Sequence, residues 1–223
     1  NSRWAVHPLA GALARYGPPA ELAARYRGAR VIALMAGSRR YDIGHHLSQL
    51  IEAARLLRSE GRFLPVFSVA PGLSEPLRRE ILERAAGFET WDGEGRGLMA
   101  VSEAAAGVSG TVAVEAMLLR RFMVVIYNVR GLSWLIARAL VRTPYISIPN
   151  LLTDAPVFPE LLNEPRPERV VGELFAYLDD PARKAETDRR METAKDAMGA
   201  GRAAAFWARS IAEILALRKL ALE

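Results

Sequence analysis

The chain has 223 residues, of which 51% are hydrophobic and 25% are charged, and it contains no cysteine. These proportions exclude an intrinsically disordered chain, and the lack of cysteine excludes disulfide scaffolds, zinc-thiolate sites, iron–sulfur clusters and cysteine nucleophiles. The formal net charge of +5 permits an anionic partner, but the basic residues are spread along the chain without a dense block, so nucleic-acid binding is not indicated.

Short apolar runs alternate with amphipathic segments over the first two thirds of the chain. The apolar runs are typical of buried strands, and the amphipathic segments repeat at the helical period of about 3.6 residues. Strands are predicted at residues 30–35, 63–69, 89–91, 106–109 and 122–127, and helices at residues 42–59, 74–86, 98–105, 112–120 and 131–142. This alternation predicts an α/β protein with a doubly wound parallel sheet that helices cover on both faces.

The remainder of the chain is expected to be mainly helical. Residues 144–152 are expected to begin with a strand and then to place Asn150 in a turn after Pro149. From Pro167 onward the pattern predicts only helices, at residues 167–179, 181–198 and 201–221. Pro181 suits the first turn of the second of these helices.

The first strand–helix junction has the sequence Gly37-Ser38-Arg39-Arg40. In an open α/β sheet, ligands bind beyond the carboxyl ends of the strands. A Gly-Ser turn there lets backbone N–H groups approach a phosphate, and Arg39 adds a planar cation that suits phosphate oxygens. The alternative is an ordinary turn with a capping serine and a solvated arginine, because so short a motif is a weak signal.

A second junction, Ser109-Gly110-Thr111, opens the predicted helix at residues 112–120, and Glu115 follows about one turn later. Its hydroxyl and N–H groups suit an anion at a helix N-terminus. In that interpretation the phosphates lie on the N–H groups and Glu115 accepts hydrogen bonds from a sugar diol. The spacing from Thr111 to Glu115 does not fit a capping box, so the alternative is a simple interaction of Glu115 with the helix dipole.

Two further features have plain structural interpretations. The adjacent His45 and His46 point about 100° apart on a helix, so we expect a surface or cap-adjacent role rather than a shared metal ion. Residues 131–142 are apolar, contain Trp134 and are flanked by arginines. They are therefore either a core-facing helix or a segment that lies on an anionic membrane surface.

Together these motifs resemble the donor-binding, C-terminal half of the lipid-A-disaccharide synthase family, whose members are glycosyltransferases of the GT-B class. The resemblance covers roughly residues 4–180 and is densest between Gly107 and Asn163. It implies a Rossmann-like nucleotide-sugar donor domain at residues 30–180. The end of an interdomain linker and a first helix are expected at residues 1–29, and a C-terminal helical tail at residues 181–223.

The resemblance also implies a reaction. The family transfers 2,3-diacylglucosamine from its UDP donor to 2,3-diacylglucosamine 1-phosphate and releases UDP. Arg39 matches the arginine near the donor pyrophosphate, Glu115 the glutamate at the ribose, and Asn150 an asparagine of the donor site. The implied substrate-binding residues are Gly37, Ser38, Arg39, Ser109, Gly110, Thr111, Glu115 and Asn150. No catalytic residue, metal or other cofactor is implied.

The chain departs from the family pattern at Val6, Ala36, Asp42 and Asn163, where the family has glycine, proline, glutamate and glutamine. The family's acceptor site and general base are expected to lie outside this sequence, so the chain alone is expected to bind the donor nucleotide and to turn over poorly or not at all. The alternatives are another GT-B protein that acts on a UDP-sugar, or a divergent or truncated homologue that binds a UDP-sugar or a partner without catalysis.

The expected partners follow from the lipid substrates. They are the UDP-diacylglucosamine donor, the acylated glucosamine phosphate acceptor and an anionic membrane surface. No uncharged run reaches the ~18 residues of a transmembrane helix. The lack of cysteine fits a reducing cytosol, and with the lipid substrates the expected location is cytoplasmic, peripheral on the inner face of the inner membrane. Apolar residues at helical spacing in the last predicted helix, including Phe206, Trp207 and Ile211, predict a homodimer.

Overall fold

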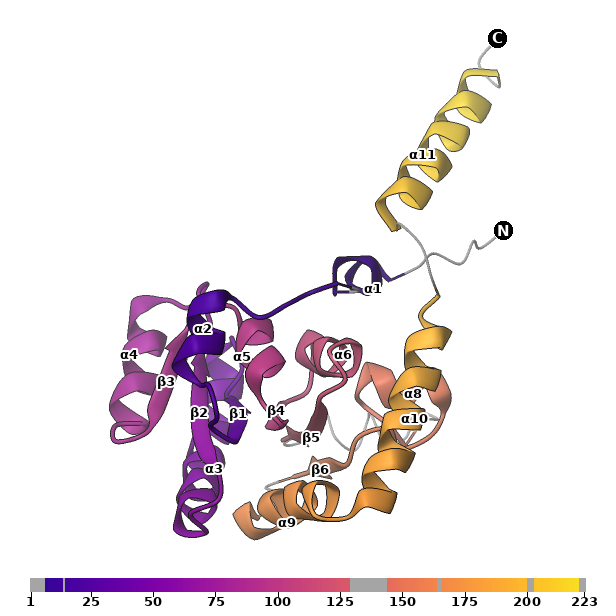
Figure 1. The fold of residues 1–223 in the computed structure, drawn as a ribbon. Helices are drawn as coiled ribbons and strands as arrows, with labels where there is room; N and C mark the ends of the chain where they lie inside the picture. Colours follow the sequence, from indigo (N-terminus) through magenta and orange to yellow (C-terminus); the bar gives the residue numbers. More distant parts are fainter. Residues whose placement is uncertain (1–6, 14, 129–143, 164–165, 200–202, 221–223) are drawn as a thin grey trace.

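A six-stranded sheet with all strands parallel forms the centre of the protein. The computed structural model describes residues 7–13, 15–128, 144–163, 166–199 and 203–220. The strands are β1 (Val31–Met35), β2 (Leu64–Val69), β3 (Glu89–Asp92), β4 (Ala104–Val108), β5 (Phe122–Tyr127) and β6 (Glu160–Leu162). They lie in the order β3-β2-β1-β4-β5-β6 (Figure 1). The predicted doubly wound parallel sheet is therefore confirmed.

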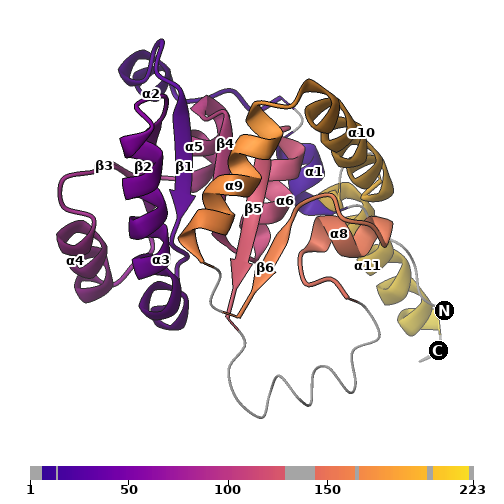
Figure 2. The same cartoon turned by 90° about the horizontal axis from the view of Figure 1, so that it is seen from below.

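Helices cover both faces of this sheet, as its continuous apolar strands require. The layer on one face consists of α3 (Arg40–Ser59), α4 (Glu75–Arg84) and α9 (Pro167–Leu178). On the other face lie α5 (Gly95–Val101) and α6 (Thr111–Leu118), and the helices packed on these two are α1 (Pro8–Leu13), α2 (Ala20–Arg25), α8 (Ile148–Thr153) and α10 (Pro181–Ala197). Figure 2 shows α9 crossing the sheet over β4 and β5, with β6 at the sheet edge.

The two central strands, β1 and β4, are completely buried and approach each other closely. Gly107 of β4 lies opposite Met35 of β1 in the register of the sheet. A Cβ atom at position 107 would lie 2.3 Å from the carbonyl oxygen of Met35, so this position requires glycine. The strand order reverses between β1 and β4, and ligands of α/β sheets bind at such a point.

The predictions for two segments are wrong. The helix predicted at residues 98–105 ends at Val101, and Ala104 already belongs to β4. Alanine favours helices locally, but here its small side chain is fully buried in a strand between two helical layers. The strand predicted at the start of residues 144–152 is also wrong, and so is the turn predicted at Asn150, which lies in a helix. Ile148–Thr153 is helix α8, which has Pro149 in its first turn, and the strand that pairs with β5 is β6.

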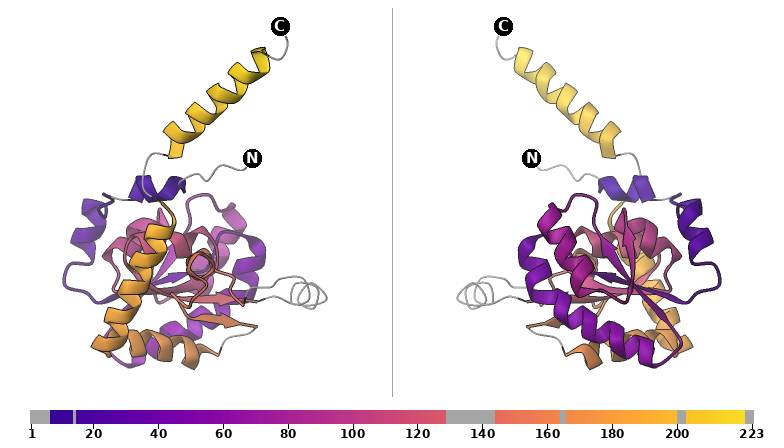
Figure 3. Two further views of the ribbon diagram at one scale, coloured as in Figure 1. Left: turned by 90° about the vertical axis from the view of Figure 1, so that its right-hand side faces the viewer. Right: turned by 90° about the vertical axis from the view of Figure 1, so that its left-hand side faces the viewer.

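The C-terminal helices lie close to their predicted bounds. Asp180 caps α10, because its side chain accepts hydrogen bonds from the N–H groups of Ala182 and Arg183 at 2.8 and 3.2 Å. Helix α10 packs against α6, α8 and α9, and its Met191 joins the core. Helix α11 (Ala203–Leu220) extends away from the body near α1 (Figures 1 and 3). The domain boundary at residue 180 stays a prediction, and the helix predicted at residues 131–142 lies outside the described residues.

Candidate functional site

A cavity of about 240 Å³ opens beyond the carboxyl ends of β1 and β4. One wall consists of residues 35–39 and Asp42, and the opposite wall of residues 108–112 and Glu115. Ser68, Ala70 and Gly95 complete the lining. The structure therefore brings together seven of the eight predicted binding residues, namely Gly37, Ser38, Arg39, Ser109, Gly110, Thr111 and Glu115.

The first wall is the turn from β1 into α3. Gly37 has a φ of 93°, a left-handed conformation that glycine adopts without strain. Arg39 occupies the N-cap position of α3, where its side chain makes no capping hydrogen bond. Its guanidinium is exposed and makes no ion pair or hydrogen bond with any residue that the structure describes. The cavity is thus lined by a cation that is available to a ligand.

The second wall is the turn from β4 into α6. The N–H of Ser109 donates to the carbonyl of Ile126 at 3.2 Å, which ties the turn to β5. Gly110 occupies the N-cap position, and no side chain caps the helix. The first N–H groups of a helix have no partner within it, and Thr111 and Val112, at the start of α6, line the cavity. A helix N-terminus of this kind attracts an anion.

Glu115 is half-buried on α6, one turn after Thr111. Burial raises the pKa of its carboxyl above the ordinary value, and the positive charge of Arg96 partly offsets this effect. Arg96 itself is bound by Glu94, with Nε to Oε2 at 2.8 Å, and lies over the ring of Tyr16. Glu115 is therefore a partly desolvated acceptor that hydroxyl donors of a ligand can satisfy.

The eighth predicted residue, Asn150, does not line this cavity. Its side chain is 1% exposed. Its Nδ2 donates to the carbonyl of Phe158 and to the carboxylate of Glu160, both at 2.8 Å. Its Oδ1 accepts from the N–H groups of Val157 and Phe158, both at 2.9 Å. The structure therefore gives Asn150 a scaffolding position between α8 and β6, and a direct donor contact stays a prediction.

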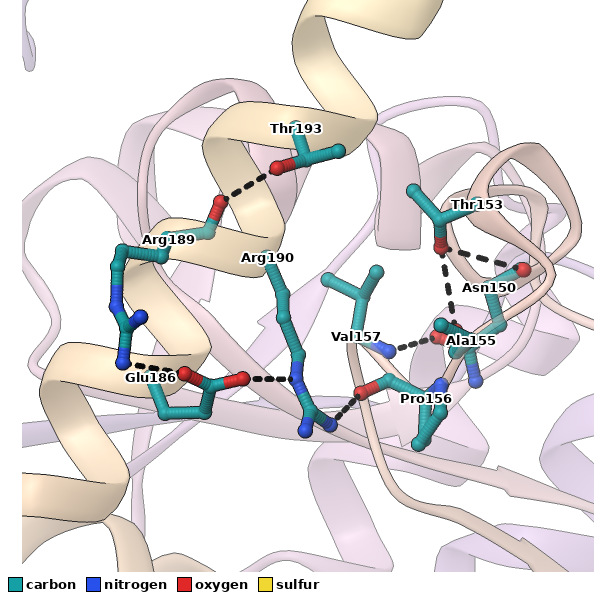
Figure 4. Close-up of polar contacts among 9 residues, drawn as sticks. All are labelled: Asn150, Thr153, Ala155, Pro156, Val157, Glu186, Arg189, Arg190 and Thr193. Carbon is teal, nitrogen blue, oxygen red and sulfur yellow. Dashed lines mark hydrogen bonds and ion pairs between the residues drawn. The ribbon is translucent and has the colours of Figure 1, made fainter.

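Helix α10 also contacts the loop between α8 and β6. The Arg190 guanidinium donates to the carbonyl of Pro156 at 2.8 Å and also pairs with Glu186 (Figure 4). Glu160 adds a third connection, because its carboxylate accepts from the N–H groups of Ile146 and Ser147, both at 2.9 Å. Side-chain hydrogen bonds thus hold the chain on either side of α8, and the pairing of β6 with β5 follows directly after them.

The expected surface role of His46 is wrong. Its side chain is fully buried, whereas His45 is half-buried and stacks on Tyr41. The Nδ1 atom of His46 lies 2.7 Å from the carbonyl oxygen of Asp42, and the Nε2 atom accepts from the N–H of Asn128 at 2.9 Å. These partners assign the neutral tautomer with the proton on Nδ1. His46 therefore links the first turn of α3, beside the cavity, to the end of β5.

The cavity residues that sequence reasoning missed include Asp42, Ser68 and Gly95. Asp42 carries the clearest signal, an acid in the first turn of the helix that follows a phosphate-type turn. Ser68 lies on β2 and Gly95 begins α5, and both line the cavity because the order of the strands places these elements beside β1. Within the described part of the chain, no three histidine or carboxylate side chains lie close enough together to hold a metal ion.

Comparison with known proteins identifies relatives of the chain. The family model described as lipid-A-disaccharide synthetase matches residues 1–206. A lipid-A-disaccharide synthase of Pseudomonas aeruginosa (strain UCBPP-PA14) is 34% identical over 200 residues, which are 82% of this chain and 50% of that protein. Another, from Mannheimia succiniciproducens, is 34% identical over 158 residues, 68% of this chain and 39% of that protein. The chain thus spans about half the length of these curated relatives, or less.

Solved structures share the fold at lower identity. The S. aureus MnaA–UDP co-structure has a TM-score of 0.59 and 18% identity, and the match covers 89% of this chain and 50% of that one. The α,α-trehalose 6-phosphate synthase from Burkholderia multivorans has a TM-score of 0.58 and 15% identity, with 98% and 50% covered. These likenesses show a shared fold, the Rossmann-like arrangement of GT-B proteins.

Proposed function

The chain belongs to the lipid-A-disaccharide synthase family, and we propose that it forms the donor-binding half of a glycosyltransferase of lipid A biosynthesis. The proposed reaction transfers 2,3-diacylglucosamine from its UDP donor to 2,3-diacylglucosamine 1-phosphate, with UDP as the leaving group. The observation that carries this proposal is the cavity beyond β1 and β4, where an unpaired arginine, the N-termini of two helices and a half-buried glutamate converge.

Each wall of the cavity receives one part of the donor. The diphosphate lies on the N–H groups at the start of α6 and against the Arg39 guanidinium, because both supply donors and positive charge to phosphate oxygens. The ribose hydroxyls donate hydrogen bonds to the Glu115 carboxylate. They replace the hydrogen bonds from water that this carboxylate loses because it is half-buried. This order of groups agrees with the position of Glu115 one turn into α6.

The same contacts assist the departure of UDP. Negative charge grows on the diphosphate as the glycosidic bond breaks. Donors that already point at this charge stabilise it without reorganisation. Arg39 and the first turn of α6 are therefore binding groups with a catalytic consequence. The proposal leaves the acceptor and its general base to parts of the enzyme beyond this cavity.

Calorimetric titration with UDP tests the proposal. We expect wild-type chain to bind UDP, and Arg39→Ala and Glu115→Ala to weaken binding at least about tenfold each, or about 1.4 kcal/mol. Arg79→Ala is the matched control, because Arg79 is an exposed cation on α4 that lies 3.7 Å from its partner Glu75 and outside the cavity. A folded wild-type chain without measurable UDP binding would contradict the proposal, as would equal affinities for all the variants.

The acceptor, membrane and homodimer partners also belong to the proposal. Helix α11 exposes Trp207, Ile211 and Ile214, by 53%, 53% and 63%, and we propose that this face pairs with a second copy. Sedimentation of a clean monomer at micromolar concentration would count against the pairing. Of the helices that the structure describes, none has both the length and the apolar character needed to cross a membrane. A peripheral position on the inner face of the inner membrane remains the proposed location.

Binding without catalysis is the second candidate. The chain spans about half of its relatives, and the cavity alone accounts for the donor. A chain that binds UDP and a UDP-sugar but releases no UDP from the diacylated donor when the acylated acceptor is added fits this second function. Turnover with both substrates fits the first.

A further inference from the structure

Asp42 lines the cavity with a carboxylate that has no partner among the residues that the structure describes. Its side chain is 8% exposed and lies in the wall of the cavity. No residue that the structure describes donates a hydrogen bond to its carboxylate, and Arg39, three positions earlier, does not pair with it. The carboxylate oxygens are not among the described side-chain atoms that are sealed from solvent without a partner, so they are accessible from the cavity. A ligand in the cavity can therefore bind this carboxylate in place of water.

The carboxylate is held firmly in this position. It packs directly on the backbone of Gly37, where a Cβ atom would lie 2.6 Å from Cβ and 3.2 Å from Oδ2 of Asp42. The carbonyl of Asp42 accepts the Nδ1 proton of the fully buried His46 at 2.7 Å. The packing on Gly37 restricts the carboxylate, and the His46 contact fixes the backbone of the same residue, which lowers the entropic cost of using the carboxylate.

The partner must be a hydrogen-bond donor. A phosphate oxygen is excluded, because it is an acceptor that carries the same charge. Two carboxylates line the cavity, Asp42 on the α3 wall and Glu115 on the α6 wall, and the phosphate donors of both turns lie among the same lining residues. A nucleoside diphosphate sugar has this pattern of groups, with hydroxyls on the ribose at one end, hydroxyls on the hexose at the other and the diphosphate between.

We propose that Asp42 accepts a hydrogen bond from a hydroxyl of the donor's hexose, while Glu115 takes the ribose. This inference rests on the proposed function and deepens it, because it makes Asp42 the residue that distinguishes a UDP-sugar from UDP. The position of Asp42 in the first turn of α3 also places it favourably in the field of the helix. That interaction acts on stability alone and predicts no discrimination between ligands.

The test compares two ligands on the complete chain. UDP and UDP-N-acetylglucosamine are titrated calorimetrically in the presence of EDTA into wild type, Asp42→Asn and Asp42→Ser. UDP-N-acetylglucosamine is soluble and shares the 4- and 6-hydroxyls of the proposed donor. We expect Asp42→Asn to weaken UDP-N-acetylglucosamine about tenfold and to change UDP affinity less than twofold. Glu115→Gln is expected to weaken both ligands.

Glu75→Gln is the matched control, because Glu75 is also an acid in the first turn of a helix but lies on α4, outside the cavity. It should change neither affinity. Thermal unfolding of each variant shows whether it is folded, and Asp42→Ser serves if Asp42→Asn is not. Equal losses for both ligands, or no loss for either, would overturn the role of Asp42 while leaving the UDP site in place. If wild type does not bind UDP, the proposed function fails as well.

Discussion

The neutral, buried His46 makes the stability of this protein depend on pH. Burial lowers the pKa of His46 below its ordinary value, and the carbonyl and charge of Asp42 only partly offset this effect. The Tyr127 ring lies beside it at 6.3 Å and His45 is next to it in the chain. Protonation would also place an N–H on Nε2 against the N–H of Asn128, which now donates to that atom.

The sign and size of the effect follow from linkage. In the unfolded chain His46 binds a proton with a pKa of about 6.5, whereas in the folded chain its pKa is lower. Stability is therefore complete above that pH and falls as the pH is lowered. At pH 5.0, proton binding to the unfolded state alone is worth about 2 kcal/mol, the upper limit of this contribution. With a urea dependence of about 2 kcal/mol/M, this contribution lowers the midpoint by at most about 1 M between pH 8 and pH 5.

Urea unfolding of wild type, His46→Gln and His45→Gln at pH 8 and pH 5 measures this effect. His46→Gln is expected to be less stable at pH 8, because it loses fitted hydrogen bonds, but to lose less stability than wild type on acidification, by at most about 2 kcal/mol. His45→Gln is the control, because its ring is half-buried on the same helix. If His46→Gln and wild type show the same change between the two pH values, His46 is not the group that titrates, and the reasoning is wrong.

Three further substitutions test the scaffold of the site, each by urea unfolding. Gly107→Ala places a Cβ atom 2.3 Å from the Met35 carbonyl and is expected to cost about 3 kcal/mol or more, whereas Gly172→Ala, which meets nothing within 4 Å, should be tolerated. Asn150→Ala leaves the buried N–H groups of Val157 and Phe158 without their acceptor and should cost about 2–4 kcal/mol; a loss below about 1 kcal/mol would show that the scaffolding position is unimportant. Asp180→Ala removes the cap of α10 and should cost about 1 kcal/mol, and Asp180→Asn should restore most of it.

Local patterns were sufficient for much of the architecture. The strand predicted at residues 122–127 has the same first and last residues as β5, and the helix predicted at residues 181–198 ends one residue after α10. Hydrophobic periodicity reports backbone conformation and burial together, so it succeeds where the two agree. It failed at Ala104 because alanine favours a helix locally, whereas burial between two helical layers decided for a strand.

The chemistry of the site divides in the same way. The sequence by itself determined the two strand–helix junctions and the family, because a glycine turn followed by a helix N-terminus binds an anion through its own backbone wherever it is placed. Only the tertiary structure decided that Asp42 and Glu115 line one cavity. It also decided that the Asn150 side chain is hydrogen-bonded to the backbone of the loop that follows α8, and that His46 is buried against Asn128. These outcomes depend on which strand ends meet across the sheet. Such pairings between distant segments produce no repeating hydrophobic pattern in the local sequence, so periodicity cannot predict them.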